Sequence, residues 1–263
     1  MKKAIIAIIL SIFLILSCSE SDNPVEVTDG SGRLTIYLSD SPASFDSVVI
    51  CISRVEVHKS GSDSTSGWSV INDSSRYFDL LQLMNGASAV LGDTSLTAGK
   101  YTQIRLIVED GSYVIDSGVR HDLIIPSGSQ TGIKLNHSFT IESNKLYELL
   151  LDFNVDKSIH ITGNGVYKLK PTIRVVPIVI SGSISGKVLP LDADPVVWTI
   201  SGVDTVSTFT NDEGFFKLVG LLEGFYDVTI SPADTTYKDS TITDIQVIQN
   251  QDTDLGTITL QSN

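Results

Sequence analysis

Apolar and polar residues alternate in short runs along most of the chain, with the period of two that half-buried β-strands produce. Leu34, Ile36 and Leu38 share one face of the first such run. Further runs predict strands at 48–57, 101–108, 112–115, 121–125, 138–141, 146–153 and 171–180. Turn residues such as Glu109-Asp110-Gly111 separate these runs, and only residues 78–84 suggest one or two helical turns. The pattern predicts a β domain over residues 33–180.

A second set of runs follows a break in composition near residues 177–182. The predicted strands are 184–189, 196–200, 205–210, 215–219, 225–230, 241–248 and 255–260. Short strands at this regular spacing are typical of a small sandwich. A hairpin turn is predicted at Asn211-Asp212-Glu213-Gly214, where the glycine would supply a positive φ. We therefore expect an all-β protein with two β-sandwich-like domains, the second over residues 183–263.

The first residues have the pattern of an export signal. Lys2 and Lys3 precede an apolar run over residues 4–16, which is too short for the roughly 20 residues of a membrane-spanning helix. The following Ile15-Leu16-Ser17-Cys18 resembles the bacterial lipobox. This resemblance implies that residues 1–17 are a lipoprotein signal peptide and that Cys18, once lipidated, is the first residue of the mature protein. The alternative is an ordinary secretory peptide with a chance cysteine.

Residues 18–32 are polar and acidic, and they predict a flexible tether behind the lipid anchor. Two or more acyl chains hold a protein stably on a membrane. We therefore expect a bacterial cell-envelope protein that is lipid-anchored, most simply to the outer membrane, and faces the periplasm or the surface. Cys51 has no intramolecular disulfide partner once Cys18 carries lipid.

The net charge narrows the choice of partners. Removing residues 1–17 leaves 16 Lys and Arg against 31 Asp and Glu, a net charge of −15. Such a chain repels phosphate backbones, so nucleic acid is excluded as a partner. Divalent cations, a glycan or another envelope protein stay among the candidate partners.

Ordered blocks in the first domain resemble a known family. They occupy residues 32–43, 55–58, 98–105, 126–130, 151–153 and 168–174. Together they are similar to the family catalogued as domain of unknown function 4382, over roughly residues 31–178. The resemblance implies a fold and an envelope association, but no reaction.

The tail resembles a carboxypeptidase regulatory-like domain, a transthyretin-type Greek-key sandwich grouped with carbohydrate-binding-like folds. The blocks that carry this resemblance are residues 185–188, 210–216 and 221–228. The tail lacks the Gly-x-Pro-Leu-x-Gly-Ala segment usual after the first strand of that family. The resemblance implies an accessory spacer or binding module.

No pattern in the chain points to catalysis. His58, His121, His137 and His160 are isolated, and neither a zinc-hydrolase motif nor a serine nucleophile elbow occurs. Cys51 lies in an apolar strand, where a thiol is usually inert packing. We expect no enzyme and no obligatory cofactor.

Ligand-binding candidates are acidic or aromatic. Asp40, Asp46 and Asp152 could form a cross-loop site for a divalent cation such as Ca²⁺, although the dense Asp ladder of a calcium loop is missing. The alternative for Asp40 is an Asx-turn before Pro42. Trp68, which follows a Ser/Gly loop, could stack on a sugar ring, whereas Trp198 is expected in the core.

These observations favour a non-catalytic envelope lipoprotein with a role in adhesion, scaffolding or ligand binding. A carbohydrate-binding protein for surface glycan capture is the first alternative, which an exposed aromatic platform would support. A hydrolase with an unrecognised carboxylate site is the second, which a buried acid pair in a cleft would support.

Overall fold

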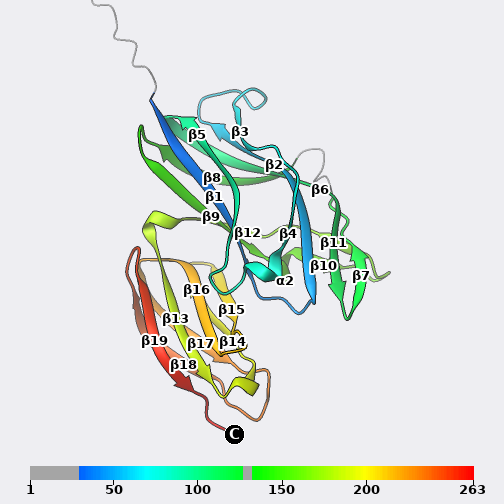
Figure 1. Ribbon diagram of the computed structural model, residues 1–263, viewed down its shortest axis with the longest axis vertical. Helices are drawn as coiled ribbons and strands as arrows, with labels where there is room; N and C mark the ends of the chain where they lie inside the picture. The colour runs from blue at the N-terminus through cyan, green and yellow to red at the C-terminus, as the bar shows by residue number, and fades with distance from the viewer. Residues whose placement is uncertain (1–29, 127–131) are drawn as a thin grey trace, which may run out of the picture.

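The computed structural model describes residues 30–126 and 132–263, which fold into two all-β domains (Figure 1). Each domain has two facing sheets, so the predicted all-β class with two sandwich-like domains is confirmed. The predicted signal peptide, Cys18 and most of the tether lie outside the described residues. Within the described part of the chain, no helix is long and apolar enough to cross a membrane.

The first domain extends from β1 to β12. Its elements are β1 (Ser31–Ser41), β2 (Ser47–Lys59), β3 (Trp68–Asn72), β4 (Arg76–Asp79), η1 (Leu80–Leu83), β5 (Ala89–Thr97), β6 (Gly99–Asp116), β7 (Val119–Asp122), β8 (Ile133–Ile141), β9 (Leu146–Asn154), α2 (Val155–Ser158), β10 (Ile159–Ile161), β11 (Tyr167–Leu169) and β12 (Ile173–Pro177). One sheet has the order β12-β9-β1-β5. The other has the order β3-β2-β6-β7, with β4 also paired to β2 and β8 to β6.

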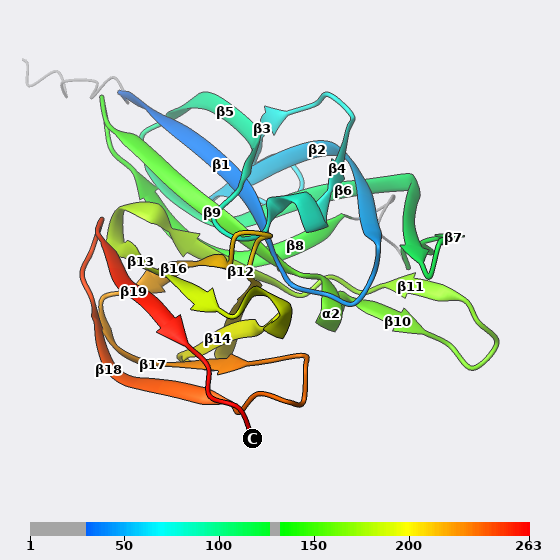
Figure 2. The same cartoon turned by 60° about the horizontal axis from the view of Figure 1, so that its bottom comes forward.

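The alternation read from the sequence determines which face of β1 is buried. Leu34, Ile36 and Leu38 are fully buried in a core that the two facing sheets share. Each such side chain contributes about 1.5–3 kcal/mol by leaving water. β1 runs parallel to β9 and antiparallel to β5, so it lies inside its sheet and not at an edge. The short hairpin of β10 and β11 projects to one side of this domain (Figure 2).

The predicted turn at Glu109-Asp110-Gly111 is wrong. β6 continues through it as one strand of 18 residues, and the turn residues form a bulge where the pairing with β2 shifts. The buried Ser112 hydroxyl accepts a hydrogen bond from the Cys51 amide at 3.0 Å and donates one to the Glu109 carbonyl at 3.0 Å. These two bonds replace the backbone bonds lost at the bulge, and the strand bends instead of ending.

The helix suggested at residues 78–84 is also only partly present. Asp79 ends β4, paired with Val49, and its side chain accepts a hydrogen bond from the Leu81 amide at the start of the 3₁₀ turn η1. β3, β4, β5, β10 and β11 were not predicted as strands. β5 shows why, because Gly92 and Asp93 interrupt its apolar residues and no alternation remains.

The second domain agrees closely with the predicted strands. Its elements are β13 (Ser181–Leu189), η3 (Leu191–Ala193), β14 (Val196–Ser201), β15 (Asp204–Phe209), β16 (Phe215–Leu222), β17 (Gly224–Ser231), β18 (Ser240–Val247) and β19 (Asp252–Thr259), and η2 (Ile178–Ile180) precedes them. The sheets β16-β13-β19 and β15-β14-β17-β18 enclose a core separate from that of the first domain. The predicted turn is confirmed, since Gly214 has φ +84° and its amide bonds the Asn211 carbonyl at 2.8 Å.

Candidate functional site at the junction of the domains

The two domains meet on the outer face of the sheet that contains β1, β9 and β12. Alternation along β9 places Leu149, Leu151 and Phe153 in the core, and leaves Leu150 and Asp152 on the opposite face. Leu150 is nonetheless buried, because the second domain covers it. The junction is therefore a packed contact between the domains.

Gly220 packs directly against the first domain. It has φ +67°, and a Cβ on this residue would lie 3.4–3.5 Å from the side chains of Arg174, Leu150 and Val176. The register between β13 and β16 shifts at this point, so Val219 and Gly220 have no partner residue across the ladder. Their carbonyls are consequently free to accept hydrogen bonds from outside the sheet.

Arg174 of β12 supplies those bonds. Its Nη1 donates to the Gly220 carbonyl at 2.7 Å, and its Nη2 donates to the Val219 carbonyl at 3.3 Å. Its Nε and Nη2 also donate to Asp152 Oδ2, at 3.1 and 2.8 Å. One guanidinium thus joins a carboxylate of the first domain to two carbonyls of the second, and we call this arrangement the Arg174 clamp.

Asp152 is held in place from both sides. It is paired with Arg174 on β12, and Ser39 on β1 lies within 3.5 Å of its Oδ1. Burial raises the pKa of Asp152, and the Arg174 guanidinium opposes that rise. The Asp152 carboxylate is therefore occupied by hydrogen bonds within the clamp and has little hydrogen-bonding capacity left for a ligand.

Asp40 lies in the same region but faces the core. Asp40 follows Ser39 on β1, so the two side chains point to opposite faces of the sheet. Asp40 Oδ1 accepts a hydrogen bond from the Val155 amide at 3.3 Å. Its Oδ2 is buried and has no hydrogen-bond partner. Burial raises the pKa of Asp40 well above its ordinary value, while the Val155 amide acts in the opposite direction.

The three candidate carboxylates do not form one site. Asp46 accepts a hydrogen bond from the Gly118 amide at 2.7 Å, at the hairpin between β6 and β7. Asp40 points into the core and Asp152 points toward the second domain. In residues 30–126 and 132–263, no three His, Cys, Asp or Glu side chains are placed to hold a metal ion. The expected cross-loop site for a cation such as Ca²⁺ is therefore not formed.

The two tryptophans considered as ligand-binding or core residues are Trp68 and Trp198. The Arg105 guanidinium lies over the Trp68 ring, 4.0 Å from its centroid, and the His58 ring contacts it edge-on with centroids 5.0 Å apart. Trp68 Nε1 donates a hydrogen bond to the Ser64 carbonyl. Trp68 is thus a packed ring beside a loop. Trp198, expected in the core, is only half-buried, because Val197 and Thr199 occupy the inner face of β14.

The remaining reactive side chains stand apart from one another. Cys51 is buried and unpaired, as expected for strand packing. His121 stacks on Tyr167 at 4.3 Å, whereas His160 is exposed on β10. His137 is half-buried on β8, in the other sheet of the first domain.

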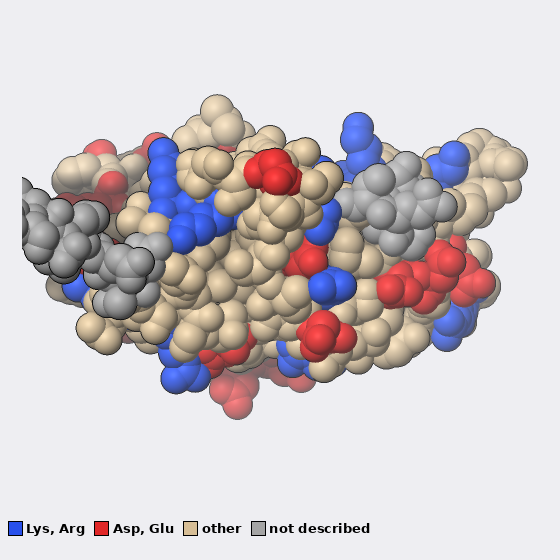
Figure 3. Space-filling model, turned by 90° about the horizontal axis from the view of Figure 1, so that it is seen from above, with Lys and Arg blue, Asp and Glu red and all other residues tan. Residues whose placement is uncertain are grey.

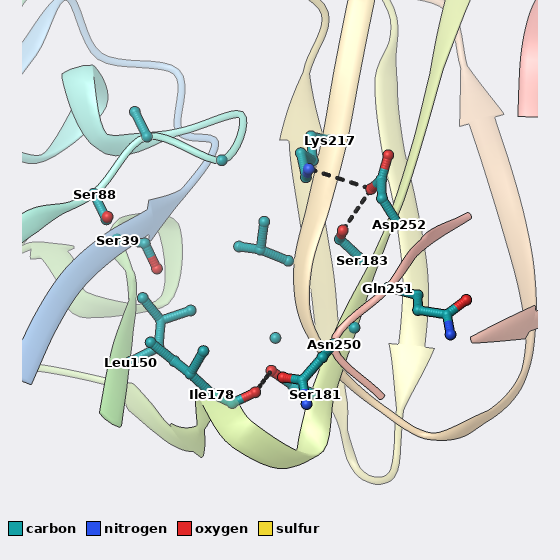
Figure 4. A pocket seen from close by; sticks show the side chains of 15 residues that line it. Ser39, Ser88, Leu150, Ile178, Ser181, Ser183, Lys217, Asn250, Gln251 and Asp252 are labelled. Atoms are coloured by element: carbon teal, nitrogen blue, oxygen red, sulfur yellow. Dashed lines mark hydrogen bonds and ion pairs between the residues drawn. The ribbon is translucent and has the colours of Figure 1, made fainter. Parts of the chain in front are cut away.

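A hollow lies beside the Arg174 clamp, and we call it the Lys217 hollow (Figure 4). It encloses about 430 Å³ and takes its walls from both domains. Lys217 pairs with Asp252 Oδ1 at 3.3 Å, and the Ser183 and Ser185 hydroxyls donate to the same carboxylate at 2.5 and 2.6 Å. Although burial raises the pKa of Asp252, these hydroxyls and the Lys217 ammonium hold it below its ordinary value.

The rest of the lining is hydroxyl, amide and small apolar groups. Ser39 and Ser88 face the hollow from the first domain, and Leu150 and Ile178 form its floor (Figure 4). On the adjoining loop, Asn85 donates to the Phe215 carbonyl at 3.0 Å and so ties the two walls together. Sequence reasoning missed Arg174 and Lys217; an arginine inside the apolar run 171–180 was the only signal.

Charge is distributed unequally between the domains. Residues 30–180 contain 13 Lys and Arg and 15 Asp and Glu, whereas residues 181–263 contain 3 lysines, no arginine and 12 acids. On the face of the molecule seen in Figure 3, basic and acidic side chains are interspersed among uncharged ones. The acidity is therefore a property of the second domain and the tether.

Several solved structures share a distant likeness with this chain. The minor pilin GBS52 of Streptococcus agalactiae is 12% identical, with 88% of this chain and 96% of that chain covered and a TM-score of 0.26. A mutant of the shaft pilin SpaA from Lactobacillus rhamnosus GG is 8% identical, with 89% and 97% covered and a TM-score of 0.27. A type II cohesin–X-dockerin complex from Acetivibrio cellulolyticus is 22% identical over 31% of this chain and 58% of that chain, with a TM-score of 0.26.

TM-scores this low establish neither a shared fold nor a shared function, and the chain spans little more than half of the cohesin–X-dockerin chain that it matches. No curated protein resembles the chain closely enough to count as a match. The family comparison is decisive for the first domain. The profile described as Domain of unknown function (DUF4382) matches residues 31–171, more than half of the chain, and the protein therefore belongs to that family.

Proposed function

We propose that this chain is a non-catalytic lipoprotein of the bacterial cell envelope, whose two β domains act as one unit that binds a partner. The observation that carries the proposal is the Arg174 clamp, because it fixes the domains around a hollow to which both contribute. Binding sites built on rigid elements keep their geometry without a ligand. We further propose that the second domain is a carboxypeptidase regulatory-like module and that Cys18 carries the lipid.

The anchor is tested with the whole chain in its bacterial host. Cys18→Ala should abolish labelling with radioactive palmitate and release the protein from the membrane fraction, because Cys18 would carry the acyl chains. Cys51→Ala is the matched control, since Cys51 is buried in β2, and it should keep both label and membrane association. Continued labelling of Cys18→Ala would overturn the anchor.

Carbohydrate is the ligand class that the Lys217 hollow favours. Serine hydroxyls, side-chain amides and an ion pair are the groups that hydrogen-bond sugar hydroxyls, and Leu150 and Ile178 offer an apolar floor. Trp68 is packed beneath Arg105 and does not line this hollow. Adhesion to or scaffolding of another envelope protein is the leading role if no glycan binds.

A glycan array probed with residues 19–263 distinguishes these roles. Lys217→Ala should lower the signal of any bound glycan at least threefold, because it removes a donor and the partner of Asp252. Lys238→Ala is the matched control, with the same charge change at an exposed position away from the hollow. A glycan signal equal in both variants places the ligand elsewhere, and no signal on the array removes carbohydrate as the ligand.

The positions of the two buried acids do not support a hydrolase. The buried acids Asp40 and Asp152 face opposite sides of one sheet, whereas general acid–base catalysis on a substrate needs both groups on one cleft. Asp40 has its oxygens in the core, and Asp152 is bound by Arg174.

A further inference from the structure

The outer face of the four-stranded sheet in the second domain carries a tryptophan, and we call it the Trp198 face. It consists of the outward side chains of β15, β14, β17 and β18, in that order across the sheet. Alternation along β14 sends Val197 and Thr199 inward and leaves Trp198 and Ile200 on the outside. The face lies across the core from the sheet that bears Lys217.

The Trp198 ring lies along this face. Its Nε1 donates a hydrogen bond to the Ser231 hydroxyl at 3.4 Å, and Ser231 is on the neighbouring strand β17, opposite Val196. An indole that reaches a side chain of the next strand lies across the sheet, with one ring face toward the strands. Trp198 is accordingly half-buried, and its other ring face is left to solvent.

Hydroxyl groups flank the ring on both sides. In the register of the sheet, Ser207 of β15 and Thr229 of β17 are opposite Trp198, and Thr241 of β18 is opposite Thr229. The Thr229 and Thr241 hydroxyl oxygens are 3.1 Å apart, and only one of the two donates in that hydrogen bond. The other keeps its proton for a ligand. One row across four strands therefore combines a flat aromatic ring with hydroxyl donors and acceptors.

Apolar surface continues along the same face. Ile200 follows Trp198 on the outside of β14 and is 52% exposed, and Phe225 on β17 is 70% exposed. Thr229 and Phe225 are four residues apart on one strand, a separation of about 13 Å at roughly 3.3 Å per residue. The face is therefore long enough for more than one ring of an extended ligand.

Charge decides which partner fits the Trp198 face. The second domain has 12 acids, no arginine and 3 lysines, and the lysines are on β13, on β16 and in the loop before β18. Anionic lipids and phosphate backbones need basic contacts, which the described strands of this face do not offer. Serine and threonine are under-represented at the energetic centres of protein interfaces. A neutral polysaccharide fits, because its C–H faces can stack on the indole while its hydroxyls bond those of serine and threonine.

We propose that the Trp198 face binds an extended, neutral polysaccharide whose rings present flat C–H faces, as those of β-linked glucose do. One sugar ring stacks on Trp198, and another lies near Phe225. This site goes beyond the proposed function. It depends neither on the lipid anchor nor on the Lys217 hollow, which opens on the other sheet of the second domain.

The probe is hydroxyethylcellulose, a soluble and neutral chain of β-linked glucose. Residues 19–263 should migrate more slowly in a native gel that contains it. Trp198→Ala should weaken this retention at least threefold, because it removes the stacking surface. Trp68→Ala is the matched control in the first domain and should retain wild-type binding. Lys217→Ala should also leave the retention unchanged, since the hollow is a separate site.

A fluorescence titration reports on the ring itself. In Trp68→Phe, Trp198 is the single tryptophan, and hydroxyethylcellulose should shift its emission to shorter wavelength and reach saturation. Carboxymethylcellulose has the same backbone with added carboxylates, and it should bind at least threefold more weakly to this acidic domain. If Trp198→Ala fails to fold by circular dichroism, Phe225→Ala replaces it, with the exposed Phe215→Ala of the other sheet as its control.

Four results would each overturn the proposal. They are unchanged migration of the wild type in hydroxyethylcellulose, equal retention of Trp198→Ala and Trp68→Ala, an emission of Trp198 that the polysaccharide does not shift, and equally tight binding of carboxymethylcellulose. A loss of retention in Lys217→Ala alone would place the polysaccharide in the hollow and not on the Trp198 face.

Discussion

Arg174→Ala is the substitution that most directly tests the junction. It removes the hydrogen bonds to Asp152, Gly220 and Val219, and it leaves a buried carboxylate without a cation. The side chains of Arg174 and Asp152 are 15% and 9% exposed, so this is a buried pair. Removing one partner of such a pair costs about 3–5 kcal/mol, because the charge left behind is uncompensated.

The loss should depend on pH. Burial already raises the pKa of Asp152, and removing Arg174 removes the group that opposes this rise. A folded-state pKa above the unfolded value of roughly 3.9 means that stability falls as pH rises through the interval between them. Arg174→Ala should therefore be closest to wild type near pH 4 and furthest from it above pH 7. Adding Asp152→Asn should recover part of the loss at high pH, because no buried charge remains.

The assay uses the two tryptophans, one in each domain. Trp198→Phe leaves Trp68 to report on the first domain, and Trp68→Phe leaves Trp198 to report on the second. In urea, the two reporters should unfold together when Arg174 is present. In Arg174→Ala they should separate, because the bonds to Gly220 and Val219 no longer couple the domains.

Lys145→Ala is the matched control. Lys145 and Glu142 form an ion pair whose side chains are 68% and 59% exposed, and exposed pairs contribute about 0–1 kcal/mol. A loss in Arg174→Ala no larger than in Lys145→Ala, with both reporters still unfolding together, would refute the Arg174 clamp as a coupling element.

Other predictions follow from single contacts. Gly214→Val should lower the free energy of unfolding, measured in urea, by at least about 1–2 kcal/mol, because residue 214 has φ +84° and its Cβ would lie 2.5 Å from the Val188 carbonyl oxygen. Gly202→Val should lower it less, since Gly202 has φ +65° but no atom within 4 Å of an added Cβ. Asp40→Asn should raise the melting temperature at pH 8 by at least about 2–4 °C. The pKa of Asp40 is raised in the folded state, so the wild type loses stability as pH rises, and the gain from the substitution should vanish near pH 4. Because Asp40, Asp46 and Asp152 do not converge, calcium, magnesium and sodium at matched ionic strength should change the melting temperature equally; a calcium-selective rise that Asp40→Ala removes would restore the cation site.

The fold could be predicted wherever one face of a strand is buried and the other is not. The seven strands predicted for the second domain are all found, with ends shifted by no more than a few residues. The errors lie where local geometry departs from simple alternation. A bulge held by Ser112 converts a predicted turn into part of β6, and Gly92 interrupts the pattern of β5.

The junction could not be predicted by the same reasoning. Asp40 and Asp152 were expected in one cross-loop site, but Asp152 lies beside Ser39 and not beside Asp40, so the two carboxylates point to opposite faces of the sheet. Which residues of β1 and β9 lie side by side depends on the register between these two strands, which are separated by over a hundred residues in the sequence. Asp46, placed near them by the sequence, is held at the β6–β7 hairpin.

The Arg174 clamp shows how an interdomain contact arises from a local irregularity. β16 is an edge strand of its sheet, and a regular edge strand leaves only every second carbonyl without a partner in the sheet. The register shift opposite Val219 and Gly220 releases two carbonyls, and the missing side chain of Gly220 lets β12 come close enough to use them. The second domain has no arginine, so a guanidinium at this contact has to come from the first domain. Because a guanidinium directs its donors along fixed lines, this single side chain constrains orientation as well as distance, which a lysine at the same position would not do.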